Sequence, residues 1–332
     1  MMLQVSSSPH IRDSITSSRL MLDVIIALSP SLIASVILFG YRSLVMVLVA
    51  VGSAVLFEYL CRRIMKRYNS IGDLSAVVTG MLLAFNMPAT APYWIVIIGS
   101  FVAIVVVKQM FGGIGYNFVN PAMAARIILT LSFPSAMTRW AVMANRAGET
   151  IGTVTQAGSA AGGTDLIATA TPLYLLQQAG GSGSSAMPSY LDLFFGTKGG
   201  CLGEVSILAL LIGVVYLIVR KVITPWIPLT YILTVAVATA LAGQDPLYHI
   251  LSGGLVLGAF FMATDYITSP LSRKGKIIFG IGCGLMTALI RLFGGMTEGV
   301  SFSILFMNIL TPQIDRWTTP VPFGGGVRRV KA

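Results

Sequence analysis

Charged residues are scarce in this sequence. Asp, Glu, Lys and Arg make up only 10% of its 332 residues, whereas 55% of the residues are hydrophobic. Soluble domains carry about 25% charged residues, and a chain of this length could not bury so much apolar surface in one soluble core. Long apolar runs with few charges indicate helices that cross a membrane. The composition therefore excludes an ordinary soluble protein and favours an integral membrane protein.

Cysteine and histidine are also few, and they are widely spaced. The three cysteines, Cys61, Cys201 and Cys283, form no CxxC pair, so an iron–sulfur cluster held by this chain alone is not expected. His10 and His249 have no second ligand at a useful spacing. No nucleotide fingerprint or Ser-His-Asp set occurs. We therefore expect no metal site and no catalytic residues in this chain.

The formal net charge is +10, which in a soluble protein would suggest a nucleic-acid partner. Here the basic residues lie mostly in short loops between apolar stretches, and most of these loops share one side if the N-terminus is inside. Loops rich in Lys and Arg face the cytoplasm. We therefore expect both termini in the cytoplasm of a bacterial cell, an even number of membrane spans and no nucleic-acid partner.

About ten apolar stretches are candidates for membrane spans. They cover residues 20–40, 43–63, 74–90, 92–110, 121–134, 201–220, 226–243, 247–266, 276–293 and 299–314. The first is long and lacks a basic segment before it, so we expect an anchoring helix and not a removed signal peptide. Those at 74–90, 121–134 and 299–314 are short and contain Gly, Pro, Asn or Thr, which is typical of broken helices that line a cavity.

A weak internal repeat divides the chain. Phe111-Gly112-Gly113 follows the fourth span and Phe293-Gly294-Gly295 follows the ninth, while Thr79-Gly80 and Ser252-Gly253 open comparable stretches. The pattern predicts an all-α membrane fold with two inverted five-helix repeats. The expected segments are a cytoplasmic start (1–19), a first repeat (20–134), an extracytoplasmic loop (135–200), a second repeat (201–314) and a cytoplasmic tail (315–332).

The long loop carries one segment of chemical interest, residues 165–173. The residue types predict a flexible segment in which Thr171 exposes its hydroxyl among small neighbours, and Pro172 favours an extended backbone at Thr171. A hydroxyl is a weak nucleophile, so any modification there needs an external catalyst. From the residue types alone, an unmodified loop threonine is the simpler interpretation.

The same segment resembles the flavinylation motif Asp-x-x-(Ser/Thr)-Gly-Ala-(Ser/Thr), in which a flavin transferase links FMN through its phosphate to the last hydroxyl. Asp165 matches the first position, Ala170 the penultimate one and Thr171 the acceptor. Ala168 stands where a hydroxyl is usual and Thr169 where glycine is usual. The resemblance implies covalent FMN on Thr171, with Thr169 as an alternative acceptor.

Five further motifs carry a resemblance that covers most of the chain. They are GGIGYNFVNPA (112–122), GEVS (203–206), FMATDYITSP (261–270), GGMTEGV (294–300) and MNILTPQID (307–315). Together they resemble the D-type membrane subunit of Rnf complexes. The B-type subunit of sodium-pumping NADH:quinone reductase is similar, but it usually has a longer N-terminal extension than the roughly 19 residues that precede the first span here. The shorter form favours Rnf.

The resemblance implies a multi-subunit complex that passes electrons between reduced ferredoxin and NAD, coupled to sodium or proton movement. Partner subunits would bind NAD and ferredoxin. This subunit would carry one flavin on the outer face, and a second, non-covalent flavin (riboflavin or FMN) in the membrane is an expectation. Its candidate ligands lie near the expected broken helices, where each could instead form an interhelical hydrogen bond: Asn117, Asn120, Arg126 and Thr264.

Acidic residues in membrane spans are costly and mark ion paths or charge partners. Glu204 and Asp265 are the ion-path candidates, with structural caps as the alternative. Asp23 is expected to pair with Arg19, and Glu58 with the nearby Arg62.

A solute channel or transporter without a redox role would suit the same span pattern equally well. An unrelated membrane scaffold is a third interpretation. The outer threonine motif separates the redox subunit from both, because a channel has no use for a covalent flavin.

Overall fold

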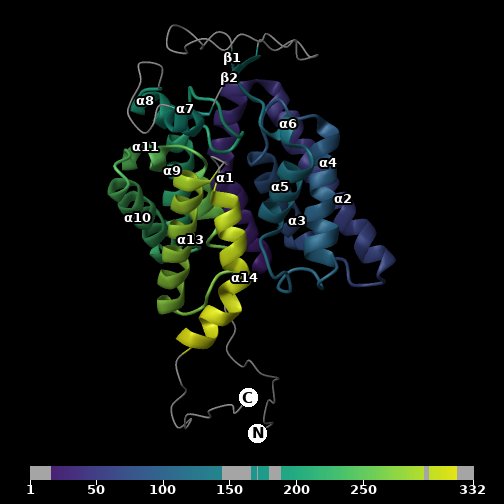
Figure 1. Ribbon diagram of the computed structural model, residues 1–332. Coiled ribbons are helices and arrows are strands. Elements are labelled where there is room, and N and C mark those ends of the chain that lie inside the picture. The colour runs from purple at the N-terminus through teal and green to yellow at the C-terminus, as the bar shows by residue number, and fades with distance from the viewer. Residues whose placement is uncertain (1–15, 144–165, 170, 179–187, 295–298, 320–332) are drawn as a thin grey trace, which may run out of the picture.

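The computed structural model describes residues 16–143, 166–169, 171–178, 188–294 and 299–319. These residues form helices that stand side by side, with one two-stranded ribbon at the end opposite the last helix (Figure 1). The first half contains α1 (Ser17–Phe39), α2 (Tyr41–Ile64), η1 (Ile71–Asp73), α3 (Ser75–Phe85), α4 (Tyr93–Phe101), η2 (Val102–Gln109), α5 (Pro121–Ser132) and α6 (Pro134–Met137).

The second half contains β1 (Trp140–Met143), β2 (Leu166–Thr169), α7 (Pro172–Gln178), α8 (Tyr190–Phe195), α9 (Ile207–Val219), α10 (Trp226–Leu241), α11 (Pro246–Leu251), α12 (Leu255–Leu257), η4 (Gly258–Met262), α13 (Arg273–Phe293) and α14 (Val300–Thr318). The ribbon was not predicted: β1 and β2 pair antiparallel, with Trp140 opposite Thr169. Short segments rich in apolar and β-branched residues suffice to form it.

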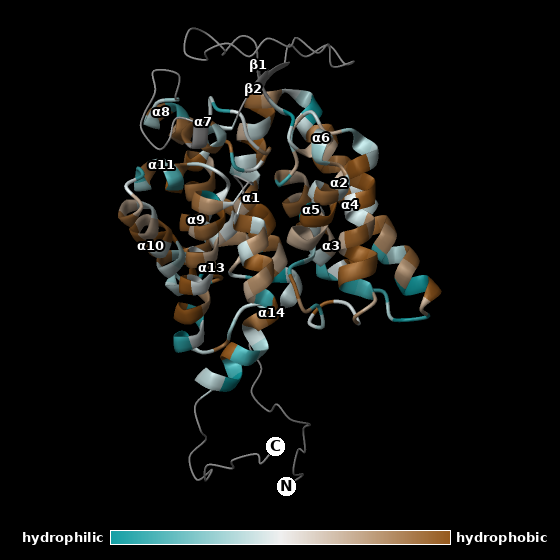
Figure 2. Ribbon diagram, viewed as in Figure 1, coloured by the Kyte–Doolittle hydropathy of each residue, from teal (hydrophilic) through white to brown (hydrophobic). Residues whose placement is uncertain are grey.

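Apolar side chains cover the outside of the bundle. α1, α2 and α13 are each long and apolar enough to cross a membrane, and α3, α4 with η2, α5, α9 and α10 are shorter apolar helices. In Figure 2 the helices are mostly brown along their length, whereas teal gathers at the turns and at the free end of α14. An apolar exterior is what a lipid environment requires. The prediction of a helical integral membrane protein is confirmed at this level.

Glycines let neighbouring helices approach closely. A Cβ atom added at Gly280 of α13 would lie 2.0 Å from Thr230 Oγ1 of α10, and one at Gly284 would lie 2.5 Å from Thr234 Cβ. Between α1 and α9, a Cβ atom at Gly213 would lie 2.0 Å from the Ala27 carbonyl oxygen. Small residues at helix crossings are typical of membrane proteins, where dispersion contacts drive association.

Two helices are interrupted by residues in the left-handed region. Leu74, with φ 60°, separates η1 from α3, and Gly253 and Gly254, with φ 67° and 66°, separate α11 from α12. The expected break in 299–314 is wrong, because α14 runs without interruption through Pro312. Proline inside a helix removes one backbone bond, and the adjacent Thr311 hydroxyl donates to the Thr268 and Met307 carbonyl oxygens there.

We predict that Gly280→Val destabilises the protein by about 1–3 kcal/mol, because the new side chain overlaps α10. Gly52→Val is the matched control, since a Cβ atom at Gly52 would meet nothing within 4 Å. Thermal unfolding in detergent, followed by tryptophan fluorescence, measures both variants. Equal midpoints for the two would contradict the close crossing of α10 and α13.

Candidate functional site

A cavity of ≈ 820 Å³, its open mouth included, lies between the two halves of the chain. Its wall combines apolar residues from α1, α3, α9 and η4 with a few polar side chains. Three of the four residues proposed for a second flavin line it, namely Asn117, Asn120 and Thr264. Asp265, an ion-path candidate, lies in the same wall. Residues that are far apart in the sequence therefore meet here.

Local structure explains why these side chains face one space. Asn120 caps α5, because its Oδ1 accepts from the backbone N–H of Ala122 at 3.1 Å, while its Nδ2 donates to the Met262 carbonyl at 3.3 Å. That second bond joins the start of α5 to the end of η4. The Thr264 hydroxyl donates to the Phe260 carbonyl at 2.6 Å. A hydroxyl oxygen that donates can still accept from a ligand.

Arg126 does not line the cavity and belongs to a separate buried network. Its Nη1 donates to Asn86 Oδ1 at 2.6 Å and its Nη2 to Cys201 Sγ at 3.4 Å. The Asn86 amide also donates to the Leu82 carbonyl at 2.6 Å. Arg126 therefore links α5 to the loop before α9, and the structure does not bring it together with the other three flavin candidates.

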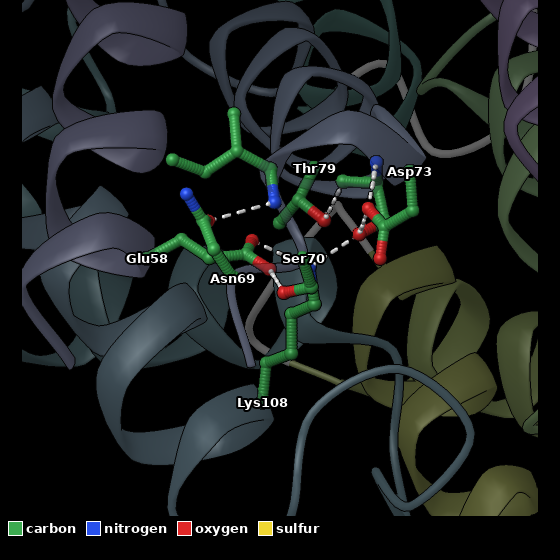
Figure 3. Close-up of polar contacts among 8 residues, drawn as sticks. Glu58, Asn69, Ser70, Asp73, Thr79 and Lys108 are labelled. Carbon is green, nitrogen blue, oxygen red and sulfur yellow. Dashed lines mark hydrogen bonds and ion pairs between the residues drawn. The ribbon is translucent and has the colours of Figure 1, made fainter. Parts of the chain in front are cut away.

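A buried ion pair stands beside the cavity. Lys108 Nζ lies 2.7 Å from Glu58 Oε2 and donates to Ser75 Oγ at 2.5 Å, and the side chains of Lys108 and Glu58 are 3% and 0% exposed. Figure 3 shows Lys108 and Ser70 converging on the Glu58 carboxylate. The prediction that Glu58 pairs with Arg62 is wrong, because Glu58 pairs with Lys108. Lys108 was overlooked because its position near a span end suggested an ordinary inner-loop cation.

The Asp23 carboxylate also has a different partner from the one expected. It accepts from Tyr216 Oη at 2.9 Å and from Arg220 Nη2 at 3.3 Å, not from Arg19. Both partners lie on or directly after α9, so the contact ties α1 to the second half of the chain. The prediction paired Asp23 with its sequence neighbour Arg19, whereas Tyr216 and Arg220 come close to Asp23 only in the folded chain.

Thr171 lies directly before α7 and is buried, so the prediction of an exposed hydroxyl is wrong: the side chain caps the helix. Its Oγ1 accepts from the backbone N–H of Tyr174 at 3.3 Å, which is the contact of a helix-capping threonine. Two residues on, Leu173 packs at the break between α11 and α12, since a Cβ atom at Gly253 would lie 2.3 Å from Leu173 Cδ1. The other two motif residues, Asp165 and Ala170, lie outside the described residues. Thr169 ends β2.

Glu204 lies on the opposite side of the same break. Its Oε1 accepts from the Cys201 N–H at 3.1 Å, and its buried Oε2 has no hydrogen-bond partner among the described residues. A Cβ atom at Gly254 would lie 2.3 Å from that oxygen. Glu204 and Asp265 are thus in different places. Asp265 accepts from the Thr268 hydroxyl at 3.2 Å, in a turn at the cavity wall.

Two buried cations that sequence analysis missed bind the end of α11. Arg291 donates to the carbonyl oxygens of His249, Ser252 and Gly253, at 2.6, 3.1 and 3.2 Å. Lys198 Nζ donates to the Leu251 carbonyl at 2.5 Å. Lys198 lies in a loop outside the apolar helices, where burial lowers the pKa of its amine to about 8. Their basic side chains gave no local signal in the sequence.

The part of the chain that the structure describes holds no group of three or more His, Cys, Asp or Glu residues that could bind a metal ion. His249 instead contacts Gln244 Oε1 through Nε2 at 2.6 Å, and its Nδ1 has no described partner. His10 lies outside the described residues.

Apolar outer faces and interrupted helices around a mostly apolar cavity define a helical integral membrane protein. The chain belongs to the NQR2, RnfD, RnfE family, whose model matches residues 4–324. This confirms the resemblance drawn from the motifs.

Three relatives match over nearly their whole length. The D-type subunit of the Na(+)-translocating ferredoxin:NAD(+) oxidoreductase complex of Acetobacterium woodii is 50% identical, with 97% of this chain and 95% of the relative covered. The D-type subunit of the proton-translocating ferredoxin:NAD(+) oxidoreductase complex of Clostridium ljungdahlii is 41% identical, with 96% of each covered. The D-type subunit of the ion-translocating oxidoreductase complex of Stutzerimonas stutzeri is 40% identical, with 96% and 94% covered.

We predict that Glu58→Gln destabilises the protein by about 3–5 kcal/mol, because Lys108 would keep its charge in a buried place without a partner. The double variant Glu58→Gln with Lys108→Met should regain most of that loss. Unfolding midpoints of the wild type, both single variants and the double variant form the cycle. Additive losses would contradict a direct interaction between the two side chains.

Proposed function

We propose that this chain is the flavin-carrying membrane subunit of a complex that couples electron transfer between reduced ferredoxin and NAD to sodium or proton translocation. The observation that carries the proposal is the 50% and 41% identity to the D-type subunits of two ferredoxin:NAD(+) oxidoreductase complexes, over nearly the full length of each chain. One relative is named for sodium and the other for protons, so the ion stays open. The chain acts as part of a translocase, with the NAD and ferredoxin sites on partner subunits.

Covalent FMN on Thr171 is the second part of the proposal. The flavinylation motif at Asp165, Ala170 and Thr171 supports it, and a flavin transferase would be the maturation partner. The structure adds that the Thr171 side chain stands at the start of α7 and next to residues packed on the α11–α12 break. The Thr171 oxygen would bond to the FMN phosphorus of a flavin donor activated as a phosphoanhydride. The anhydride P–O bond would break, the second phosphate-bearing half of the donor would leave, and a base of the transferase would take the hydroxyl proton.

We further propose that a non-covalent flavin, riboflavin or FMN, occupies the cavity. Small-molecule sites are mostly apolar concave spaces with a few convergent polar groups, and this cavity has that lining. Leu82, Phe260 and Phe261 supply apolar wall for a flat ring, and Asn120 and Thr264 supply convergent polar groups. When bound, a flavin supplies one- and two-electron chemistry, while this chain binds the ring and excludes water.

The ion path is proposed to use Asp265 at the cavity and Glu204 at the α11–α12 break. Glu204 Oε2 is buried without a described hydrogen-bond partner, and a buried acidic residue in a membrane protein marks a pathway or a charge partner. A role like that of the B-type subunit of a sodium-pumping NADH:quinone reductase is the alternative within the same family. The solute-transporter alternative has no observation of its own here.

We also propose two inverted repeats, α1–α5 and α9–α14, each with five spans. Helix packing supports this, because α2 packs on α3 and α4 as α10 packs on α11 and α13. α1 packs against α9, and α5 against α14, across the middle of the molecule. The third span of each repeat is interrupted at a left-handed residue, Leu74 or Gly254. Both termini would then be cytoplasmic and the loop 135–200 extracytoplasmic, in the bacterial inner membrane.

We predict that Thr171→Val abolishes covalent flavin, because the acceptor oxygen is lost. Thr171→Ser should keep it, since serine offers the same oxygen, and Thr169→Val should keep it as well. Each variant is co-expressed with the transferase, denatured and examined by in-gel fluorescence and intact mass. Fluorescence that survives in Thr171→Val and disappears in Thr169→Val would move the attachment to Thr169.

We predict that Thr264→Leu reduces the acid-extractable flavin of the purified complex at least tenfold, because the larger side chain projects into the cavity. Thr130→Leu is the matched control: its hydroxyl makes the same bond to the carbonyl four residues before, at 2.8 Å, outside the cavity wall. Covalent fluorescence serves as the internal reference. Equal extractable flavin in both variants would exclude this cavity as the second flavin site.

A further inference from the structure

Two buried cations lie together without a carboxylate bound to either. Lys198 is 4% exposed and Arg291 is 5% exposed. Their side-chain hydrogen bonds go to neutral carbonyl oxygens at the end of α11. Burial of a cation costs free energy unless a counter-charge compensates for it. The two side chains therefore leave an excess of positive charge inside the protein.

Glu204 is the nearest described carboxylate to both, but it does not neutralise them as a bound partner. Its Oε1 accepts from the Cys201 N–H, and its Oε2 has no described hydrogen-bond partner. Asp192 and Asp245, the other described acids at this end of the molecule, cap α8 and α11 through backbone N–H groups. Among the described residues the pair thus forms a positive site with one carboxylate beside it.

The positive site adjoins the segment that carries Thr171. A Cβ atom at Gly253 would meet Leu173 Cδ1 at 2.3 Å and Arg291 Nη2 at 2.7 Å, so the guanidinium and α7 are close neighbours. Lys198 binds the Leu251 carbonyl, and Leu251 packs on the cluster that includes Leu176 of α7. Arg291 is therefore a direct neighbour of the short helix that Thr171 begins, and Lys198 is linked to that helix through Leu251.

We propose that Lys198 and Arg291 stabilise negative charge on the flavin attached to Thr171 and so raise its reduction potential. The inference rests on the proposed covalent FMN. The phosphodiester brings one negative charge to this place, and each electron that enters the ring without a proton brings another. In a low-dielectric surrounding, fixed cations favour the more negative redox state. The attached flavin in turn supplies negative charge in addition to that of Glu204, which is one carboxylate beside two cations.

The test is a potentiometric titration of the covalent flavin in the purified complex, with flavin attachment verified by intact mass in every variant. Lys198→Met should make one-electron reduction at least tenfold less favourable, a downward shift of about 59 mV or more. Arg291→Met should act in the same direction, and Arg291→Lys should retain most of the wild-type potential because it keeps the charge.

Arg42→Met is the matched control. Arg42 also donates to backbone carbonyls, those of Thr90 and Ala91, but it stacks over Tyr93 at the other side of the bundle. Its loss should leave the potential unchanged. If flavin is attached in all variants and Lys198→Met has the same potential as the wild type, the electrostatic role is overturned and the proposed function stands. A wild-type chain without attached flavin overturns the proposed function and this role together.

Discussion

The structure depends on how the backbone groups at interrupted helices find hydrogen-bond partners in an apolar surrounding. A helix that stops inside a membrane leaves backbone groups that no water can reach. Arg291 of α13 fills that role at the break between α11 and α12, because it donates to three carbonyl oxygens at the end of α11. In the first half Lys108 of η2 instead donates to the Ser75 side-chain hydroxyl at the start of α3 and pairs with Glu58. In each half a cation from the fourth helix is therefore bound next to the interrupted third span.

The interruptions also place polar groups in the interior of the bundle. A continuous helix has every backbone group occupied, whereas a broken one exposes carbonyls and brings polar side chains into the core. Asn120 caps α5, donates to the Met262 carbonyl and also lines the cavity. A residue that joins two helices can thus also line the cavity, as Asn120 does.

The sequence predicted the membrane helices, which depend on local pattern. It did not predict the side-chain partners, which depend on tertiary contacts. The apolar runs indicated membrane helices, and Asn117, Asn120 and Thr264 line one cavity in the folded chain. The partners of Asp23 and Glu58 were chosen from sequence neighbours and were wrong, because α9 and η2 bring Arg220 and Lys108 closer in space. α14 also tolerates its proline, since Thr311 supplies a nearby polar contact. Nothing local distinguishes Lys198 or Arg291 from surface cations.

The seam between α1 and α9 limits how the two halves can move. At Gly213 the backbones of these helices approach so closely that a Cβ atom would lie 2.0 Å from the Ala27 carbonyl oxygen. Asp23 and Arg220 fasten the same two helices near one end. A contact this close, with an ion pair on the same two helices, opposes sliding of α1 along α9. The α1–α9 contact therefore fixes how far the first half of the chain can shift along the second.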